Sequence, residues 1–453
     1  MKGRTPETDG ETPGYLGGGL RGPALQANGS PRDTMQETTF FTQLLGISLP
    51  WFISKVVLSK EEQRVDIYVD HSKGFAFPCP ECERLCFVYD HMREREFRHL
   101  NVCQMATFIH VRLPRIECPE HGVLQIVSGL GEDNSSMTYE FESLVLDLEQ
   151  ECSIESVCRL LDMNWHPCWG VMERAVERGK QRKAHRIPQR IGVDEKSFSK
   201  GHRYETLVYD IDAATVEYVG DKRDQESLEK YYKQFTLEER EQVKSIAMDM
   251  WDPYIAATKA YIPEAERKIV FDRYHVMRLV VDAVDKVRKQ EHRALMEDGN
   301  ELLKGTKYLW LWNEENIPPY RWTEFEHLRS LDLKVCRARA IKDNLRNLWN
   351  YHKEGWMRRY FSRWYFWATH SRLSPIIKAA KSLKSHIDNI ATYARHRITN
   401  ALGESLNSKI EKVKRLACGY RNRDHYKTAI YFHCGGLDLY PRRKPGAFQV
   451  MNA

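Results

Sequence analysis

The chain has 453 residues, of which 42% are hydrophobic and 29% are charged, and its formal net charge is +6. This length exceeds one ordinary core, and the composition is typical of a globular protein with several domains. No apolar run is long enough to span a membrane and no apolar segment stands at the amino terminus, so we expect neither a membrane protein nor a secreted one.

Residues 1–34 are rich in Gly, Pro, Thr and Ser and have almost no periodic apolar pattern. Such a segment cannot bury enough apolar surface to become ordered, so we expect a disordered leader. The alternating apolar residues of Val56–Leu58 and Val65–Val69 then predict two strands joined by a polar turn.

Two pairs of potential metal ligands follow, Cys79-Pro-Glu-Cys82 and Cys118-Pro-Glu-His121. Each pair presents two ligands from one tight turn, and two such pairs complete the tetrahedral set of a structural Zn²⁺ site. Unconnected cysteines in a reduced core are the alternative. Four more residues could replace a misassigned ligand: Cys86, Cys103, His91 and His99.

Basic residues accompany these pairs at Arg93, Arg95, Arg98, Arg112 and Arg115. We therefore expect a zinc-binding module that contacts DNA. Eleven cysteines in a chain without a signal sequence indicate thiols or metal ligands rather than disulfides. This use of cysteine is typical of a reducing compartment, and we expect a cytoplasmic, nucleoid-associated protein.

Helical spacing extends from Tyr139 to Arg178, where Ser153 and Asn164 are placed to cap two successive helices. Pro167 falls in the first turn of the last helix, where its missing N–H does no harm. Two short helices about a tight turn are typical of a helix-turn-helix. The last helix carries candidates for DNA contact: Trp165, His166, Trp169, Arg174 and Arg178. A plain helical hairpin in a core is the alternative, because this helix is not strongly basic.

After Pro188 the apolar spacing changes to two, and Ile191-Gly192-Val193 leads directly into Asp194 and Glu195. Strands are predicted at 191–194, 203–212, 215–220, 243–249 and 268–272, and helices at 225–235 and 253–261. This order predicts an α/β fold with a ribonuclease-H-like mixed sheet. In such a sheet the strands that end at Asp194 and Asp249 lie side by side.

Two neighbouring carboxylates, Asp194 and Asp249, do not both stay ionised without a cation between them. Oxygen ligands favour Mg²⁺ or Mn²⁺. One aspartate at a strand end is usually a turn residue, but the second favours a metal site. Glu195 points to the opposite face if its strand continues. Three residues could lie near the site or serve only as strand-end turns: Asp252, Asp272 and His275.

Residues 276–395 have helical spacing and many tryptophans, at Trp310, Trp312, Trp322, Trp349, Trp356, Trp364 and Trp367. We expect an all-helical insertion packed on these aromatic side chains. Stacking of some of them on unpaired bases is the alternative.

Taken in order, these motifs resemble the bacterial insertion-sequence transposases of the ISL type, the "ISL three" family of DDE-type recombinases. The resemblance spans about Gln36 to Phe432 and includes the two ligand pairs and the helices after them. The remaining matches are Gly192-Val193-Asp194-Glu195, Met248-Asp249-Met250, Phe271-Asp272-Arg273-Tyr274-His275-Val276, Thr399-Asn400, Glu404-Ser405-Leu406-Asn407-Ser408-Lys409-Ile410 and Gly419-Tyr420-Arg421-Asn422. One departure is the second ligand pair, which is Cys-x-x-His where a second Cys-x-x-Cys is common in the family. His can replace a thiolate on zinc.

The resemblance implies that Asp194, Asp249 and Glu404 form a catalytic triad for two Mg²⁺ or Mn²⁺ ions. It implies a transposase that binds the terminal inverted repeats of an insertion sequence, hydrolyses phosphodiesters at its ends and transfers the strands to target DNA. Double-stranded DNA would be its partner, and joining two ends would require a homo-oligomer in the synaptic complex. A non-catalytic DNA-binding repressor derived from a transposase and a metal-dependent nuclease without strand transfer are the alternatives.

Glu404 has the least support from the residues themselves. The apolar stripe of its helix lies almost opposite, at Ile398, Leu402, Leu406, Ile410 and Val413. The assignment requires the polar face to turn toward the acids of the sheet while the stripe packs elsewhere, for instance on the insertion. Glu411 is the fallback. Residues 376–423 contain eleven Lys or Arg and three Asp or Glu, which indicates a phosphate-contact surface or a solvated face.

The expected fold is therefore a ribonuclease-H-like core with a large helical insertion, preceded by a zinc-binding module and a helix-turn-helix. The expected segments are a leader (1–34), the zinc-binding and DNA-binding module (35–130), the helix-turn-helix (131–182), the first part of the core (183–275), the insertion (276–395), the last helix of the core (396–432) and a tail (433–453).

Overall fold

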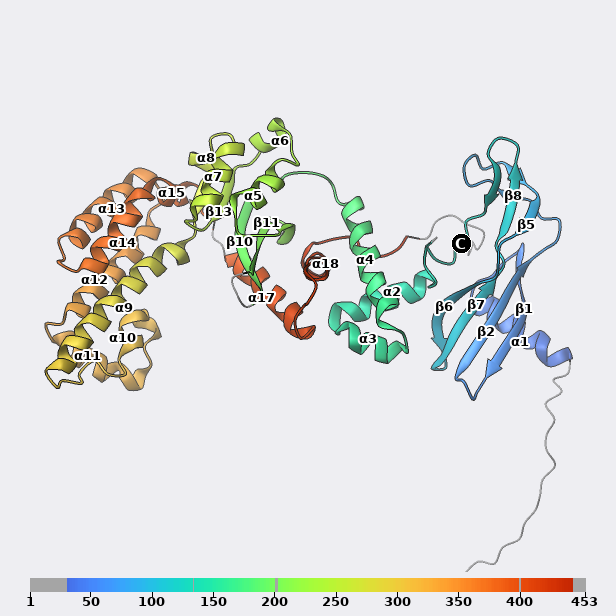
Figure 1. Cartoon of the computed structure of the whole chain (residues 1–453), viewed down its shortest axis with the longest axis horizontal. Helices are drawn as coiled ribbons and strands as arrows, with labels where there is room; N and C mark the ends of the chain where they lie inside the picture. Colours follow the sequence, from blue (N-terminus) through green and yellow to red (C-terminus); the bar gives the residue numbers. More distant parts are fainter. Residues whose placement is uncertain (1–30, 133, 200–202, 399–400, 443–453) are drawn as a thin grey trace, which may run out of the picture. The chain divides into compact units, whose positions relative to one another are not determined.

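The computed structural model describes residues 31–132, 134–199, 203–398 and 401–442 (Figure 1). Of these, residues 31–141 belong to one compact unit and residues 142–442 to a second. Helix α1 (Pro31–Leu44) begins within the last residues of the expected leader. The rest of that leader, and the end of the expected tail from residue 443, lie outside the described residues. None of the described helices combines the length and the apolar character needed to cross a lipid bilayer.

The first unit is built mainly of strands. One sheet has the order β1-β2-β7-β6, with β2 parallel to β7 and the other neighbours antiparallel. A smaller antiparallel sheet has the order β5-β8-β9, and β3 pairs with β4. Alternate residues of β2, namely Val65, Ile67 and Val69, are buried, because one face of the larger sheet covers a core. The two strands expected first are confirmed as β1 and β2.

The strand bounds in this unit are β1 (Trp51–Ser59), β2 (Arg64–His71), β3 (Phe77–Pro78), β4 (Leu85–Cys86), β5 (Val88–His91), β6 (Arg95–Val102), β7 (Met105–Val111), β8 (Pro114–Cys118) and β9 (Gly122–Gln125).

The second unit contains a five-stranded sheet of order β12-β11-β10-β13-β14. Strand β10 is antiparallel to β11 and parallel to β13, and β13 is parallel to β14. The two strands that lead to Asp194 and Asp249 are therefore neighbours, as predicted. The strands are β10 (Arg190–Ser199), β11 (Arg203–Asp210), β12 (Thr215–Gly220), β13 (Ser245–Met248) and β14 (Ile269–Phe271).

The two faces of this sheet are covered by different helices. Ile191, Val193 and Val208 share a core with α5 (Gln225–Tyr232), α7 (Asp252–Tyr261) and the helical insertion. The opposite face packs on α17 (Ala401–Leu416) and α18 (Arg423–Cys434). On that face Gly192 leaves space for a neighbouring ring, because a Cβ there would lie 1.9 Å from Cε2 of Tyr209.

The insertion is all-helical, as expected (Figure 1). Its buried side chains form one continuous core with those of the sheet. The expectation that its tryptophans form a core is right for Trp310, Trp349 and Trp364, which are buried, and in part for Trp322, which is partly buried against that core. It is wrong for the three that are exposed, Trp312, Trp356 and Trp367. The helices after β10 that are not yet bounded are α6 (Leu237–Glu241), α8 (Ala265–Lys268), α9 (Arg273–Glu297), α10 (Lys307–Leu311), η1 (Glu314–Asn316), η2 (Pro319–Arg321), α11 (Trp322–Ser330), α12 (Lys334–Leu345), η3 (Arg346–Asn350), α13 (Glu354–Thr369), α14 (Ser374–Ser385), α15 (Ile387–Ala391) and α16 (Tyr393–His396).

Three helices precede the sheet: α2 (Tyr139–Glu151), α3 (Ile154–Leu161) and α4 (Trp165–Arg182). The side chain of Ser153 accepts a hydrogen bond from the N–H of Ser156, so the predicted cap of α3 is confirmed. Asn164 stands at the N-cap of α4, but its side chain makes no capping hydrogen bond, so the predicted side-chain cap is wrong. Helix α4 packs against α18 within the second unit.

Candidate functional site

Acidic side chains gather beside the ends of β13 and β14 and the middle of β10. The predicted strand end at Asp194 is wrong, because β10 continues to Ser199 in its pairing with β11. Gly192 of β10 pairs in register with Ala247 of β13, and Asp194 and Asp249 each follow two residues later on the same face. Asp272 directly follows β14 and is buried, as is Asp249. We call Asp194, Asp249 and Asp272 the acidic edge. The sheet places these carboxylates together although they are far apart in the sequence.

Asp194 is held by two donors and lies largely out of water. The N–H of Glu195 donates to its Oδ1 at 2.7 Å, and Nδ2 of Asn407 on α17 donates to its Oδ2 at 2.7 Å. Burial raises the pKa of Asp194 to about 6, and the charge of Asp249 adds to the rise, while the donors and His275 oppose it. A cation beside Asp194 would remove this cost.

Asp249 has one basic neighbour, His275 of α9. Nε2 of His275 lies 2.9 Å from Oδ1 of Asp249. Burial opposes protonation, but the carboxylates of Asp249, Asp272 and Asp194 outweigh it and raise the pKa of His275. Apart from this imidazole, the buried Oδ1 of Asp249 has no partner among the described residues, which leaves it open to a metal ion.

Asp252, Asp272 and His275 were predicted either to lie near the site or to serve only as turn residues. Two of them lie at the acidic edge. His275 contacts Asp249, and Asp272 caps α9 by accepting a hydrogen bond from the N–H of Tyr274 at 2.5 Å. Asp272 therefore has both roles. Asp252 is the exposed first residue of α7, so it serves as a helix-start residue.

Glu195 points away from the acidic edge, as the continuation of β10 predicts. It pairs with Arg223 at 2.5 Å, and the guanidinium of Arg223 lies 4.3 Å from the ring centroid of Trp251. Burial raises the pKa of Glu195 to about 7, although Arg223 opposes the rise. This ion pair holds the Glu195 side chain on the face of β10 opposite to Asp194.

Glu404 is exposed on the first turn of α17. Its assignment required the apolar stripe of this helix to pack away from the sheet, for instance on the insertion. That requirement is not met, because Leu406 and Ile410 pack on the sheet face that carries Asp194. Glu404 still lies within electrostatic reach of the acidic edge. Burial raises the pKa of Tyr209, and the charges of the acidic edge and of Glu404 all add to that rise.

Glu411, the fallback for the third carboxylate, is committed elsewhere. It pairs with Nζ of Lys196 at 3.0 Å, and this contact lowers its pKa. Lys196 also donates to the carbonyl of Asn407 at 3.1 Å. The pair fastens α17 to β10 and leaves Glu411 away from the acids.

Two residues of the site were not predicted: Asn407, which donates to Asp194, and Tyr209, whose buried phenol lies near the acids. Asn407 is three residues beyond Glu404 on one helix face, which is a local signal that could have identified it. The sequence signal for Tyr209 is weaker, because it lies near the acids only through its pairing opposite Gly192 in the sheet.

The predicted zinc ligands lie together in the first unit. Potential ligand atoms of Cys79, Cys82, Cys118 and His121 are all within 4.8 Å of one another. The Sγ atoms of Cys82 and Cys118 are 3.7 Å apart, and Nδ1 of His121 lies 3.5 Å from Sγ of Cys118. A tetrahedron with bonds of about 2.3 Å has edges of about 3.8 Å. The four atoms therefore have the spacing of a zinc site.

Cys118 is also prepared as a thiolate. The N–H of Glu120 and the imidazole and N–H of His121 lower its pKa to about 6, although burial opposes them. Thiolate is the form that binds metals. The donors come from the same tight turn as the ligands, which is why a short sequence motif is sufficient to build half of the site.

The four possible substitute ligands are not needed. His91 contacts His71 at 2.8 Å, His99 contacts Thr138 at 2.9 Å, and Cys103 is exposed. Cys86 is buried beside the set and donates to the carbonyl of Arg84.

One more group of ligand-type atoms lies within 4.8 Å in the described part of the chain, formed by Asp66, Glu96 and His110. Arg64 already pairs with Asp66 at 2.7 Å and with Glu96 at 2.6 Å, so this group is an ion-pair network. The triad of Asp194, Asp249 and Glu404 does not form such a group among the described residues.

Acidic neighbours reduce the basic character expected of the first unit. Arg115 pairs with Asp90, and Arg112 lies 3.8 Å from Glu94. Arg98 donates to the carbonyl of His99 at 2.6 Å. The expected DNA contact therefore has fewer free charges than the sequence indicates.

The candidates for DNA contact on α4 are mostly committed to packing. Arg174 and Arg178 both pair with the buried Glu142, at 2.9 and 3.1 Å. Trp169 is buried and its ring lies 4.3 Å from the ring of His425 of α18 in a tilted arrangement, while Trp165 is exposed. These contacts attach α4 to the rest of the second unit.

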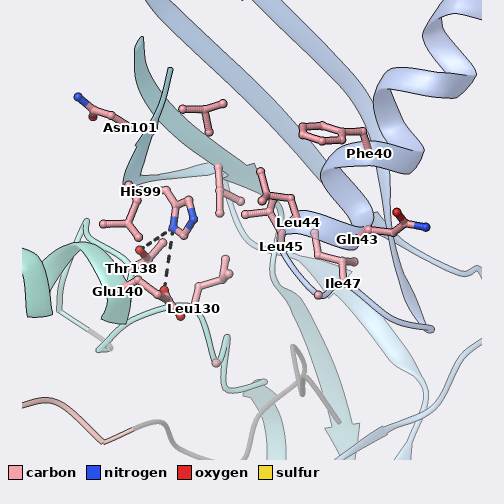
Figure 2. A pocket seen from close by; sticks show the side chains of 15 residues that line it. Phe40, Gln43, Leu44, Leu45, Ile47, His99, Asn101, Leu130, Thr138 and Glu140 are labelled. Carbon is pink, nitrogen blue, oxygen red and sulfur yellow. Dashed lines mark hydrogen bonds and ion pairs between the residues drawn. The ribbon is translucent and has the colours of Figure 1, made fainter. Parts of the chain in front are cut away.

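The first unit also has a pocket of about 840 Å³ beside the end of α1 (Figure 2). Phe40, Leu44 and Leu130 give it an apolar wall, and His99 forms a polar corner with Thr138 and Glu140. Of the residues singled out from the sequence, it contains His99, one of the possible substitute zinc ligands.

Two family profiles match the chain. A profile for the ISL3 type of DDE transposase, described as a transposase, matches residues 191–430, from β10 into α18. A second, described as the zinc-finger of the transposases of IS204, IS1001, IS1096 and IS1165, matches residues 76–121, which contain all four predicted zinc ligands.

Curated relatives match over most of their length. The transposase for insertion sequence element IS1001 of Bordetella parapertussis is 25% identical over 362 residues, which is 78% of this chain and 87% of the relative. The transposases for insertion sequence element IS1557 of two Mycobacterium tuberculosis strains are each 25% identical over 419 residues, which is 86% of this chain and 93% of the relative. These matches extend over both units.

Proposed function

The chain belongs to the ISL3 family of insertion-sequence transposases, and from this premise we propose that it binds the terminal inverted repeats of an element and catalyses phosphodiester hydrolysis and strand transfer. The observation that carries the proposal is a pair of carboxylates on adjacent parallel strands, the half-buried Asp194 within β10 and the buried Asp249 directly after β13. Their mutual charge favours a divalent cation, and both offer oxygen ligands.

The chain's own residues have distinct tasks in this reaction. Asp194 and Asp249 hold Mg²⁺ or Mn²⁺, and Asn407 fixes the orientation of the first carboxylate. Bound ions would activate water or a DNA 3′-hydroxyl and stabilise the leaving oxygen. His275 contacts Oδ1 of Asp249, and the raised pKa of this imidazole favours a positive charge beside that carboxylate.

Glu404 is proposed as the third carboxylate. Its position on the first turn of α17, three residues before Asn407, and its electrostatic reach to Tyr209 support this role. An exposed carboxylate can turn toward the acidic edge by a rotamer change, since its side chain is not packed.

The sheet order and directions support a ribonuclease-H-like core, with antiparallel β12, β11 and β10 followed by parallel β13 and β14. For α3 and α4, the helical-hairpin alternative has more support than a DNA-reading helix-turn-helix, because Arg174 and Arg178 are engaged by Glu142. Residues 76–121 are proposed to hold a structural Zn²⁺ and to contribute DNA contacts.

A cleavage assay tests the proposal. The full chain is incubated with Mg²⁺ and a duplex that carries the terminal repeats of its element, and nicking and joining are measured. We expect both, and we expect Asp194→Ala and Asp249→Ala to lose both while DNA binding is retained. Cleavage without joining would support a nuclease, binding without cleavage would support a repressor, and cleavage by Asp194→Ala would refute the assignment of the site.

The reaction also implies a setting for the protein. Two element ends must be joined, so we expect a homo-oligomer in the synaptic complex with the ends and target DNA. Its proposed substrate is chromosomal DNA, so we expect it in the bacterial cytoplasm beside the nucleoid.

A further inference from the structure

Helix α13 exposes a row of aromatic and basic side chains that the proposed reaction does not yet use. We call this row the α13 stripe: Trp356, Arg359, Arg363, Phe366, Trp367 and His370. Apart from the neighbours Phe366 and Trp367, its members follow one another at steps of three and four, so they lie on one helix face. The opposite face of α13 is buried in the core through Met357, Phe361 and Trp364.

The aromatic members are unusually open to solvent. Trp356 is 54% exposed, Phe366 is 64% exposed and Trp367 is 39% exposed, whereas Trp364 on the same helix is 2% exposed. Large apolar side chains that are exposed together mark interaction surfaces. Helix stability does not require them there, because the buried face of α13 already supplies its packing.

The basic members have no acidic partners. Neither Arg359 nor Arg363 forms an ion pair within the described part of the chain, whereas Arg358 on the next face pairs with Asp388. The guanidinium of Arg359 lies 5.5 Å from the ring centroid of Trp356. Residues 352–372 contain five Lys or Arg and one acid, Glu354. The stripe therefore offers uncompensated positive charge between exposed aromatic side chains, of which Trp356 and Trp367 have the larger rings and Phe366 stacks on His370.

The amino end of α13 is fastened to α16 and to the residue that follows it, Arg397. Glu354 pairs with Arg395 of α16 at 2.9 Å, and Arg397 donates to the carbonyl of Tyr351 at 2.9 Å. Helices α15 and α16 contact β14, the strand that ends at Asp272. The stripe thus begins on elements that pack directly on the acidic edge's own sheet.

We propose that the α13 stripe binds a DNA strand with unpaired bases, stacking bases on its exposed aromatic rings and pairing phosphates with its two arginines. Rings and arginines that alternate along about 21 Å of helix match a single strand, whose bases are free to stack. A duplex hides its base faces, and an apolar protein partner would leave the arginines without counter-charges. The inference rests on the proposed function, since cutting the element's ends releases such strands.

Fluorescence anisotropy of the full chain tests this, with Asp194→Ala as the background and EDTA present so that no cleavage occurs. The probes are a labelled single-stranded oligodeoxythymidine and a blunt duplex of the same length. We expect Trp356→Ala or Trp367→Ala to lower the affinity for the single strand by about 10-fold or more. Affinity for the duplex should not change. Trp356→Phe should restore most of the loss, which a folding defect would not predict.

The charges have a separate readout. Arg359→Gln combined with Arg363→Gln should reduce the slope of log K against log salt concentration by about 1.4 for the single strand. The matched controls are Lys381→Gln, an exposed charge on α14 outside the stripe, and Tyr320→Ala, an exposed aromatic at 85%. Tyr320→Ala should leave both affinities as they are.

Three results would overturn the proposal: equal loss for both probes, a loss of the same size in Tyr320→Ala, or self-association of the chain that Trp356→Ala abolishes. The last would make the stripe an interface between copies. Because the background is catalytically inactive, a failure here leaves the carboxylate site untouched. Conversely, a chain that binds the single strand as expected but never cleaves would refute the proposed reaction alone.

Discussion

Replacing Asp194 with asparagine should stabilise the metal-free protein at neutral and alkaline pH. Burial and the neighbouring Asp249 raise the pKa of Asp194 from 3.8 to about 6. A carboxyl group with a raised pKa contributes its full stability only below its unfolded pKa, and the contribution is lost as the pH rises through about 6. Asparagine carries no charge, so Asp194→Asn avoids that loss.

The size of the effect follows from the shift. A rise of about 2 pKa units corresponds to about 3 kcal/mol at most, and to less where water reaches the carboxylate. The substitution should not disturb the local hydrogen bonds. The N–H of Glu195 can still donate to Oδ1, and the amide of Asn407 can rotate to accept from the new side chain, because its own Oδ1 has no partner among the described residues.

Scanning calorimetry of both proteins in EDTA measures this. At about pH 8 the transition of Asp194→Asn should lie several degrees above that of the wild type, and the gap should shrink at about pH 5. Added Mg²⁺ should raise the wild-type transition and leave that of the variant unchanged.

A variant that is no more stable than the wild type at alkaline pH would refute the argument that burial and the charge of Asp249 raise the pKa of Asp194 in the metal-free fold. A Mg²⁺ response that survives in Asp194→Asn would show that the ion binds elsewhere.

Three further predictions concern other parts of the chain. Gly192→Ala should lower stability by about 1–3 kcal/mol in denaturant titrations, because the new Cβ overlaps the ring of Tyr209; a neutral result would mean that this ring moves freely. Glu149 is fully buried, and burial raises its pKa to about 8, so its stabilising contribution is lost as the pH rises from 4.5 through about 8. Glu149→Gln should therefore be more stable than the wild type at alkaline pH, by a few kcal/mol at most in the free energy of unfolding, and its thermal transition should be higher. Equal thermal transitions there would contradict the raised pKa of Glu149. Cys82→Ser should lower the zinc content measured by mass spectrometry and make residues 76–121 susceptible to proteolysis, because they unfold without the metal. Full zinc retention would remove Cys82 from the ligand set.

Local patterns were sufficient to predict much of this protein. The ligand pairs that end at Cys82 and His121 come together as expected, because each tight turn fixes its two ligands and only one long-range contact remains to be made. Strand alternation placed Asp194 and Asp249 on two strands, because the period of two determines both the strand and the direction of each side chain. Asp249 does follow the end of its strand, but β10 continues past Asp194 to Ser199, because β11 pairs with it there. The neighbouring strands then followed from the order of the elements.

Contacts between distant segments decided what these patterns could not. The apolar stripe of α17 was predicted, but the surface that it covers is the sheet, so Asn407 rather than Glu404 contacts Asp194. The tryptophans of the insertion were predicted as one set, yet Trp364 is core while Trp356 faces solvent. Spacing along a chain specifies an element and the directions of its side chains, whereas the partner of each face depends on packing energies summed over residues far apart in sequence.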